Sequence, residues 1–73
     1  MRITAIDLLI IDKIITLKKA SVIQIYELLK TNMKLEKRQL YKRLYKLEKY
    51  GIIRKDRKGF YKVVKIPKSL FFF

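Results

Sequence analysis

The 73-residue sequence contains no cysteine and no histidine, and it has one proline and two glycines. The absence of cysteine excludes disulfides and thiolate metal sites, and the absence of histidine removes the commonest general base and metal ligand. Neither a Ser–His nor a Cys–His pair can form, and no glycine-rich phosphate loop is present. The sequence therefore predicts no enzyme, no metal site and no cofactor.

Long hydrophobic runs are also lacking. The longest runs, residues 8–11 and 70–73, have four residues each, whereas a helix needs ~20 apolar residues to span a bilayer. Residues 1–4 do not have the hydrophobic region or the cleavage site of a signal peptide. We therefore expect a cytoplasmic protein that is not embedded in a membrane.

Acidic residues are scarce, with six Asp and Glu against nineteen Lys and Arg, and the net charge is +13. The charge is uneven along the chain. Residues 1–33 carry five basic and three acidic side chains, a net charge of +2, whereas residues 34–73 carry fourteen basic and three acidic ones, a net charge of +11. A domain this basic is attracted to polyanions, and the asymmetry predicts that the first part is scaffold and the second part meets the ligand.

The first predicted helix covers residues 5–17 and is capped by Thr4, with Asp7 near the positive end of its dipole. Its apolar side chains cover an arc of roughly 200°, which is more than one core needs. The helix therefore either runs through the centre of its own domain or also packs on a second copy of the chain. The candidates for a homodimer interface are Ile6, Ile10, Ile14, Leu17, Phe71, Phe72 and Phe73.

Two more helices are predicted. A Ser-x-x-Gln capping box at Ser21 and Gln24 opens a helix that ends near Lys30, after a connector with one or two residues of strand. Its predicted core face consists of Val22, Ile25, Tyr26, Leu28 and Leu29. The third helix covers about residues 36–50 and ends at Gly51, and its core stripe consists of Leu40, Leu44 and Leu47. The opposite side of this helix carries cations and tyrosines but no acid.

A hairpin follows, with strands at residues 52–55 and 60–64 and a tight turn in which Gly59 supplies a positive φ. Pro67 ends the regular structure. We therefore expect one domain over residues 1–66 and a short apolar tail over residues 67–73.

The order of helices and hairpin suggests a known family through the pattern Leu40-x3-Leu44-x2-Leu47-Glu48-x2-Gly51-Ile52-Ile53-x-Lys55. This pattern resembles the recognition helix and first wing strand of small prokaryotic, archaeal and viral winged helix-turn-helix regulators. The resemblance covers residues 4–65, although Leu35 and Glu36 stand where such domains often have a capping Ser or Thr. It implies a mostly α fold of three helices with a small β-hairpin as the wing, and it implies binding to double-stranded DNA at the nucleoid.

An α-helix fits the major groove of B-DNA, and the N-terminal half of the inserted helix comes closest to the bases. Arginine can pair with guanine and glutamine with adenine. The candidates for contacts with bases are Arg38, Gln39, Tyr41 and Lys42, and those for contacts with the DNA backbone are Tyr45, Lys46 and Lys49. The wing candidates are Arg54, Lys55, Arg57, Lys58 and Lys62.

The sequence thus predicts a homodimeric transcription regulator that binds specific sequences in double-stranded DNA. Two alternatives stay open. A winged-helix module for protein interaction would work through an apolar patch. A protein that coats nucleic acid without specificity would bind with a steep salt dependence and no preference between sequences.

Overall fold

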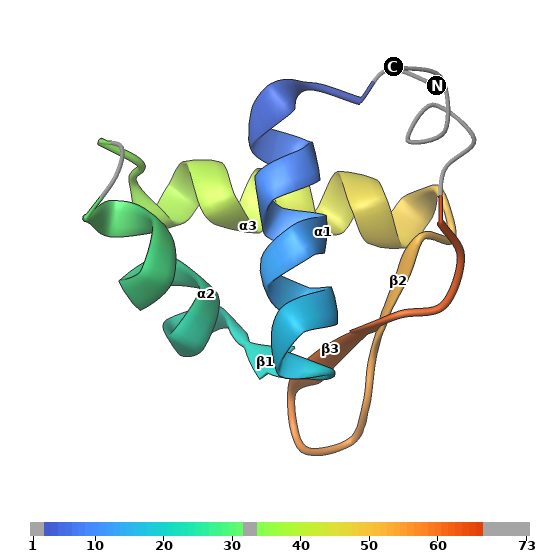
Figure 1. Cartoon of the computed structure of the whole chain (residues 1–73). Coiled ribbons are helices and arrows are strands. Elements are labelled where there is room, and N and C mark those ends of the chain that lie inside the picture. The colour runs from blue at the N-terminus through green and yellow to red at the C-terminus, as the bar shows by residue number, and fades with distance from the viewer. Residues whose placement is uncertain (1–2, 32–33, 67–73) are drawn as a thin grey trace.

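The computed structural model describes residues 3–31 and 34–66. Its elements are, in chain order, α1 (Ala5–Leu17), β1 (Ala20–Ser21), α2 (Val22–Lys30), α3 (Lys37–Lys49), β2 (Ile53–Lys55) and β3 (Phe60–Val63) (Figure 1). Three helices and a small antiparallel sheet are compatible with the winged-helix layout. The predicted helices differ from the observed ones by no more than one residue at either end, and the short strand predicted after the first helix is present as β1.

Reciprocal hydrogen bonds between side chain and backbone start α1 and α2. The Thr4 hydroxyl accepts from the Asp7 N–H at 3.2 Å, and the Asp7 carboxylate accepts from the Thr4 N–H at 2.9 Å. Ser21 and Gln24 form the same arrangement, with distances of 3.2 and 2.9 Å. Both caps satisfy N–H groups that a helix leaves without partners in its first turn. The predicted starts of these two helices are therefore confirmed.

Gly51 turns the chain from α3 into β2 with a φ of +76°, a backbone conformation that favours glycine. Its N–H donates to the Glu48 carbonyl at 3.0 Å, and the Ile52 N–H donates to the Leu47 carbonyl at 3.0 Å. These two bonds satisfy carbonyls at the end of α3 and hold the first strand of the hairpin against the helix.

The sheet has the strand order β1-β3-β2, with all neighbours antiparallel. Ala20 and Lys55 both pair with Tyr61, from opposite sides of β3, and Ile53 pairs with Val63. Ala20, Ile53 and Tyr61 are buried. Because β1 directly precedes α2, this pairing joins the hairpin to the helical part of the fold.

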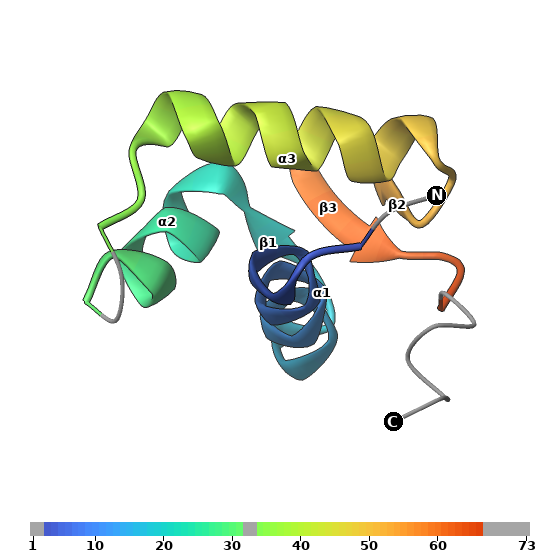
Figure 2. The same cartoon turned by 90° about the horizontal axis from the view of Figure 1, so that it is seen from above.

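The core lies between α1, α3 and the sheet. Leu40, Leu44 and Leu47 of α3 and Ile10 and Ile14 of α1 are all 0% exposed. The two helices cross each other in Figure 1, and Figure 2 shows α3 on one side of α1 with the sheet beside both. The helix α1 is buried on one face only, because Leu9, Ile15 and Leu17 are 39%, 46% and 39% exposed. The interpretation that α1 runs through the centre of its own domain is therefore wrong, and packing on a second copy stays a prediction.

This core corrects part of the predicted dimer interface. Ile10 and Ile14 cannot contact a second copy because their side chains are fully used inside the domain. Ile6 is half-buried, and Leu17 is 39% exposed. The candidates Phe71, Phe72 and Phe73 lie outside the described residues.

The predicted core face of α2 is wrong at Leu28, which is 39% exposed. Leu28 instead lines an open apolar groove of about 310 Å³ with Leu17 at the end of α1 and Ile23 and Glu27 on α2. Ile23 is 67% exposed. We call this feature the α1–α2 groove.

Residues 3–31 and 34–66 include no helix that is both long enough and apolar enough to cross a membrane.

Candidate nucleic-acid interface

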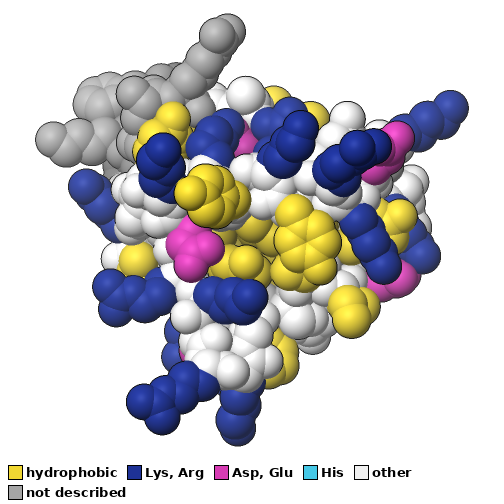
Figure 3. Space-filling view, turned by 180° about the vertical axis from the view of Figure 1, so that it is seen from behind, with side chains coloured by type: hydrophobic (Ala, Val, Ile, Leu, Met, Phe, Trp, Pro, Cys, Tyr) yellow, Lys and Arg dark blue, Asp and Glu magenta, His cyan; other side chains and the backbone are white. Residues whose placement is uncertain are grey.

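The side of α3 that points away from the core is the most open part of the helix. At 100° per residue, Arg38, Lys42, Tyr45 and Lys49 lie opposite the leucine stripe, and we call them the outer face. All four are exposed, with Tyr45 at 68%. Figure 3 looks onto the side of the molecule where α3 lies. Lys and Arg side chains there surround a central area coloured as hydrophobic, a class that includes tyrosine, and acidic side chains also lie on this side. No described element covers the outer face.

Arg38 stands in the first turn of α3, and its side chain is 81% exposed. Its Nη2 atom lies 4.0 Å from the Glu36 carboxylate, and Glu36 is also exposed. A pair this long in water contributes little to stability. The guanidinium can therefore turn toward a ligand at low cost.

One edge of the outer face is aromatic and adjoins the sheet. Tyr41 is 55% exposed, whereas Tyr61 of β3 is buried. Burial raises the pKa of Tyr61, and the negative charge of Glu48 raises it further, so the phenol stays neutral at ordinary pH. The Lys55 ammonium lies 6.0 Å from the centre of the Tyr61 ring. Lys55 and Tyr61 thus lie together on the sheet that adjoins this edge of α3.

The other edge of α3 is cationic and hollow. An open hollow of about 510 Å³ lies where the first turns of α1 meet α3, and we call it the α1–α3 hollow. It is lined by Ile6, Lys34, Leu35, Gln39, Lys42, Arg43 and Lys46. Arg43 was not among the candidates predicted from the sequence, because its angular position next to the core stripe gave no indication of a partner on α1.

A buried carboxylate connects α1 with this edge of α3. Asp7 is 0% exposed, and it forms ion pairs with Lys46 and with Arg43, whose Nη1 lies 3.4 Å from Asp7 Oδ1. The same Nη1 donates to the Thr4 hydroxyl at 3.0 Å. Burial by itself raises the pKa of Asp7, but bonds from Lys46 and from the Thr4 N–H and hydroxyl, with the charge of Lys46, lower it more. Asp7 is therefore a carboxylate that fixes two cations.

Two candidates have structural partners that the sequence did not indicate. Lys46, predicted to contact the DNA backbone, is paired with Asp7 and is only half-exposed. Gln39, predicted to contact adenine, uses its Oε1 to accept from the Glu36 N–H at 3.3 Å. Pairing with adenine uses both the oxygen and the nitrogen of the amide, and the bond to Glu36 restricts how the Gln39 amide can be oriented for it.

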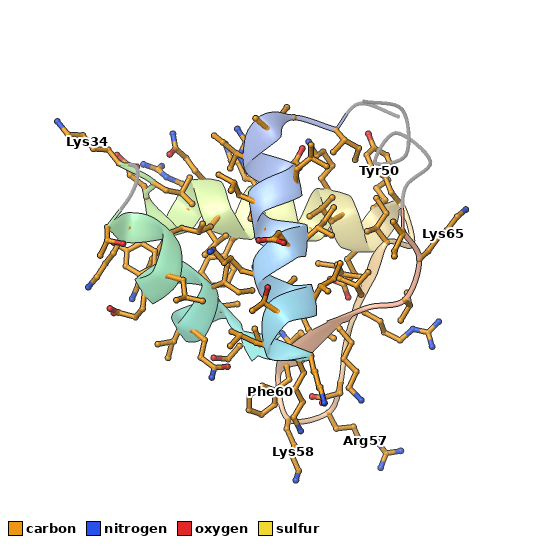
Figure 4. The ribbon with its side chains drawn as sticks, in the orientation of Figure 1. Lys34, Tyr50, Arg57, Lys58, Phe60 and Lys65 are labelled. Atoms are coloured by element: carbon orange, nitrogen blue, oxygen red, sulfur yellow. The ribbon has the colours of Figure 1, made fainter. Side chains whose placement is uncertain are left out.

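The wing places its cations at an exposed turn. The Asp56 carboxylate accepts from the backbone N–H groups of Phe60 and Lys58, both at 2.9 Å, and these bonds lower its pKa. Gly59 has a φ of +91°, which confirms the positive φ predicted for it in the tight turn. Arg57 and Lys58 project from this turn in Figure 4. The other wing candidates, Arg54, Lys55 and Lys62, are also exposed.

The charges exposed on this side of the molecule are mostly positive. Within residues 3–31 and 34–66, no group of three acidic, histidine or cysteine side chains could hold a metal ion. Exposed cations lie on α3 and on the β2–β3 hairpin, and others, among them Lys18, Lys19 and Lys30, lie outside these elements. Comparison with models of known protein families finds no match to the sequence, and a search of curated proteins finds no similar sequence.

Proposed function

We propose that the protein is a winged-helix regulator that binds specific sequences in double-stranded DNA, with α3 in the major groove and the β2–β3 wing on the backbone or in the minor groove. The observation that carries the proposal is the outer face of α3. It is exposed and cationic, whereas the opposite side of the same helix builds the core. The acid within α3, Glu48, lies on the aromatic edge beside the sheet and leaves the outer face positive.

The first turns of α3 carry the side chains that we assign to the bases. Arg38 can form two hydrogen bonds with guanine, and Lys42, one turn later on the same face, can reach a guanine or a phosphate. Tyr41 and Tyr45 can pack on thymine methyl groups or sugars. Because Gln39 already bonds to the start of the helix, we assign sequence preference chiefly to Arg38 and Lys42.

The wing supplies contacts that do not depend on sequence. Arg57 and Lys58 stand at an exposed turn that Gly59 and the Asp56 carboxylate keep tight. Cations at such a position neutralise phosphates, which positions a protein on DNA without selecting a sequence.

Selection from a random duplex library followed by sequencing tests the proposal. We expect an enriched inverted repeat whose half-sites lie about one helical turn, ~34 Å, apart. Binding with a steep salt dependence and no enriched sequence would instead identify a coating protein. Absence of duplex binding at low salt would reject the DNA-binding proposal.

The inverted repeat requires a homodimer, and we place the second copy at the α1–α2 groove. Two chains of charge +13 repel each other, so contact is favoured where cations are few, and the groove is lined by three apolar residues, Gln24 and Glu27 but no cation. Ile23→Asp puts a charge on the most exposed apolar side chain there. Sedimentation equilibrium should give a dimer for the original chain and a monomer for this variant. A strictly monomeric original chain at high micromolar concentration would remove the dimer from the proposal.

A further inference from the structure

The α1–α3 hollow has a strong excess of positive charge. Four cations line it, and none of the residues that line it is acidic. The buried Asp7 carboxylate pairs with two of these cations and supplies only one negative charge. A net excess of three positive charges therefore remains around a concave site, where low-dielectric walls strengthen the field on an anion. Ile6 and Leu35 provide such walls.

Two of the cations are already held in place. Arg43 and Lys46 have side chains that are only 27% and 30% exposed, and both are bound to Asp7. A guanidinium has five N–H donors in a planar fork, so the bonds of one Nη1 to Thr4 and Asp7 leave further donors for a ligand. Side chains fixed before binding lose little conformational entropy when the ligand arrives.

We propose that the α1–α3 hollow binds a phosphate group. Arg43 and Lys46 form the fixed part of the site, and the more exposed Lys34 and Lys42 stand at its rim, where the side chain of Lys34 projects outward (Figure 4). The excess charge and the fork of Arg43 match the charge and the oxygen geometry of phosphate. The phosphate belongs either to the DNA backbone, in which case the inference rests on the proposed function, or to a free phosphorylated compound.

Inorganic pyrophosphate is the probe that tests the site without DNA. Titration of the full chain at constant ionic strength, followed by ¹H–¹⁵N NMR, should give saturable shifts at residues that line the hollow. Calorimetry on Lys34→Gln/Lys42→Gln should show an affinity at least about tenfold lower, because two rim charges are lost. The matched control variant Lys13→Gln/Lys18→Gln removes the same charge further along α1, toward and beyond its C-terminal end. Its affinity for pyrophosphate should be less than about threefold lower. Equal losses in the two pairs, or shifts that do not saturate, would overturn the proposal.

Arg43→Lys tests the fixed part of the site without leaving Asp7 unpaired. The variant keeps the positive charge beside the carboxylate but loses the planar fork. We expect a folded protein, judged from its NMR spectrum, with a pyrophosphate affinity about fivefold lower. A folded Arg43→Lys variant with unchanged affinity would contradict the assignment of Arg43.

A competition experiment distinguishes the two sources of phosphate and separates this proposal from the proposed function. Displacement of duplex DNA by pyrophosphate, at fixed ionic strength, assigns the site to the DNA backbone. Independent binding of duplex DNA and pyrophosphate assigns the α1–α3 hollow to a free phosphorylated compound. Saturable pyrophosphate binding without any duplex binding supports the hollow and rejects the DNA-binding function. Duplex binding without saturable pyrophosphate binding rejects the hollow and leaves the function intact.

Discussion

The two sides of α3 have opposite relations to the rest of the molecule. On the inner side, Leu40, Leu44 and Leu47 are 0% exposed and pack in the core. On the outer face, the side chain of Arg38 is 81% exposed and Tyr45 is 68% exposed. A substitution on the inner side should therefore change the stability of the fold, whereas one on the outer face should change only binding. We therefore assign stability and the proposed DNA binding to different positions of the same 13-residue helix.

The largest expected effect is on the inner side. Leu44→Ala removes a fully buried side chain and should lower the free energy of unfolding by about 2–5 kcal/mol. A domain of this size has a total stability on the order of 4–11 kcal/mol, so the loss is a large share of it. Urea unfolding followed by circular dichroism measures this change. A loss below about 0.5 kcal/mol would show that the inner stripe does not hold the core.

On the outer face, Arg38→Ala should weaken binding to the preferred duplex by about 1–3 kcal/mol and relax the preference at one base pair. Its free energy of unfolding should stay within about 0.5 kcal/mol of the original, because the side chain is exposed. Competition between the selected duplex and its single-base variants measures the preference. An unchanged preference in a variant that binds less tightly would assign Arg38 to phosphate rather than to a base.

Asp7 departs from this division because it supports the fold and also fixes cations beside the outer face. Asp7→Asn should lower the free energy of unfolding by about 1–2 kcal/mol at pH 7. The pKa of Asp7 is lower in the folded chain than its ordinary value of 3.8, so its carboxylate stabilises the fold above that pH. This contribution is lost as the pH falls through the lowered pKa.

Urea unfolding at several pH values checks the sign. The difference in stability between the original chain and Asp7→Asn should be constant above pH 5 and decrease below about pH 4. Asp56 also has a lowered pKa, but it is present in both proteins and cancels in the difference. The exposed Asp12→Asn on α1 is the control and should change stability by less than about 0.5 kcal/mol. A difference that grows toward acid pH would contradict the ion pairs of Asp7.

The smallest effect is expected at the wing. Lys58→Ala should weaken binding to all duplexes to a similar extent. It should also reduce the slope of the logarithm of the binding constant K against the logarithm of salt concentration by about one. Binding titrations at several salt concentrations, on the selected duplex and a scrambled one, measure both quantities. A loss confined to the selected duplex would mean that Lys58 contacts a base.

Most of the fold was predictable because local signals agree with the tertiary structure. The capping pairs of Thr4 with Asp7 and Ser21 with Gln24, together with Gly51 and Gly59, fix where elements begin or end. Lys18 gave no such signal. It has a φ of +69° at the end of α1, a conformation that favours glycine. There the tertiary path of the chain overrides the local preference of the residue.

The candidate site was only partly predictable, because helical periodicity gives the direction of a side chain but not its partner. The exposure of Arg38, Lys42 and Tyr45 follows from their angular distance from the leucine stripe. The ion pairs of Asp7 with Arg43 and Lys46 join residues 36 and 39 positions apart, so they depend on how α1 crosses α3. The exposure of Leu28 depends likewise on how α2 is tilted against the core, which its apolar pattern does not determine.

The most direct test of the outer face compares two triple variants of equal charge by fluorescence anisotropy with a labelled duplex. Arg38→Gln/Lys42→Gln/Lys49→Gln changes the outer face, and Lys13→Gln/Lys18→Gln/Lys30→Gln changes exposed or half-exposed cations in and just after α1 and α2. Our account predicts a loss of affinity of about 100-fold or more for the first and less than about fivefold for the second. Equal losses would contradict it, because the duplex would then respond to the total charge and not to the surface of α3.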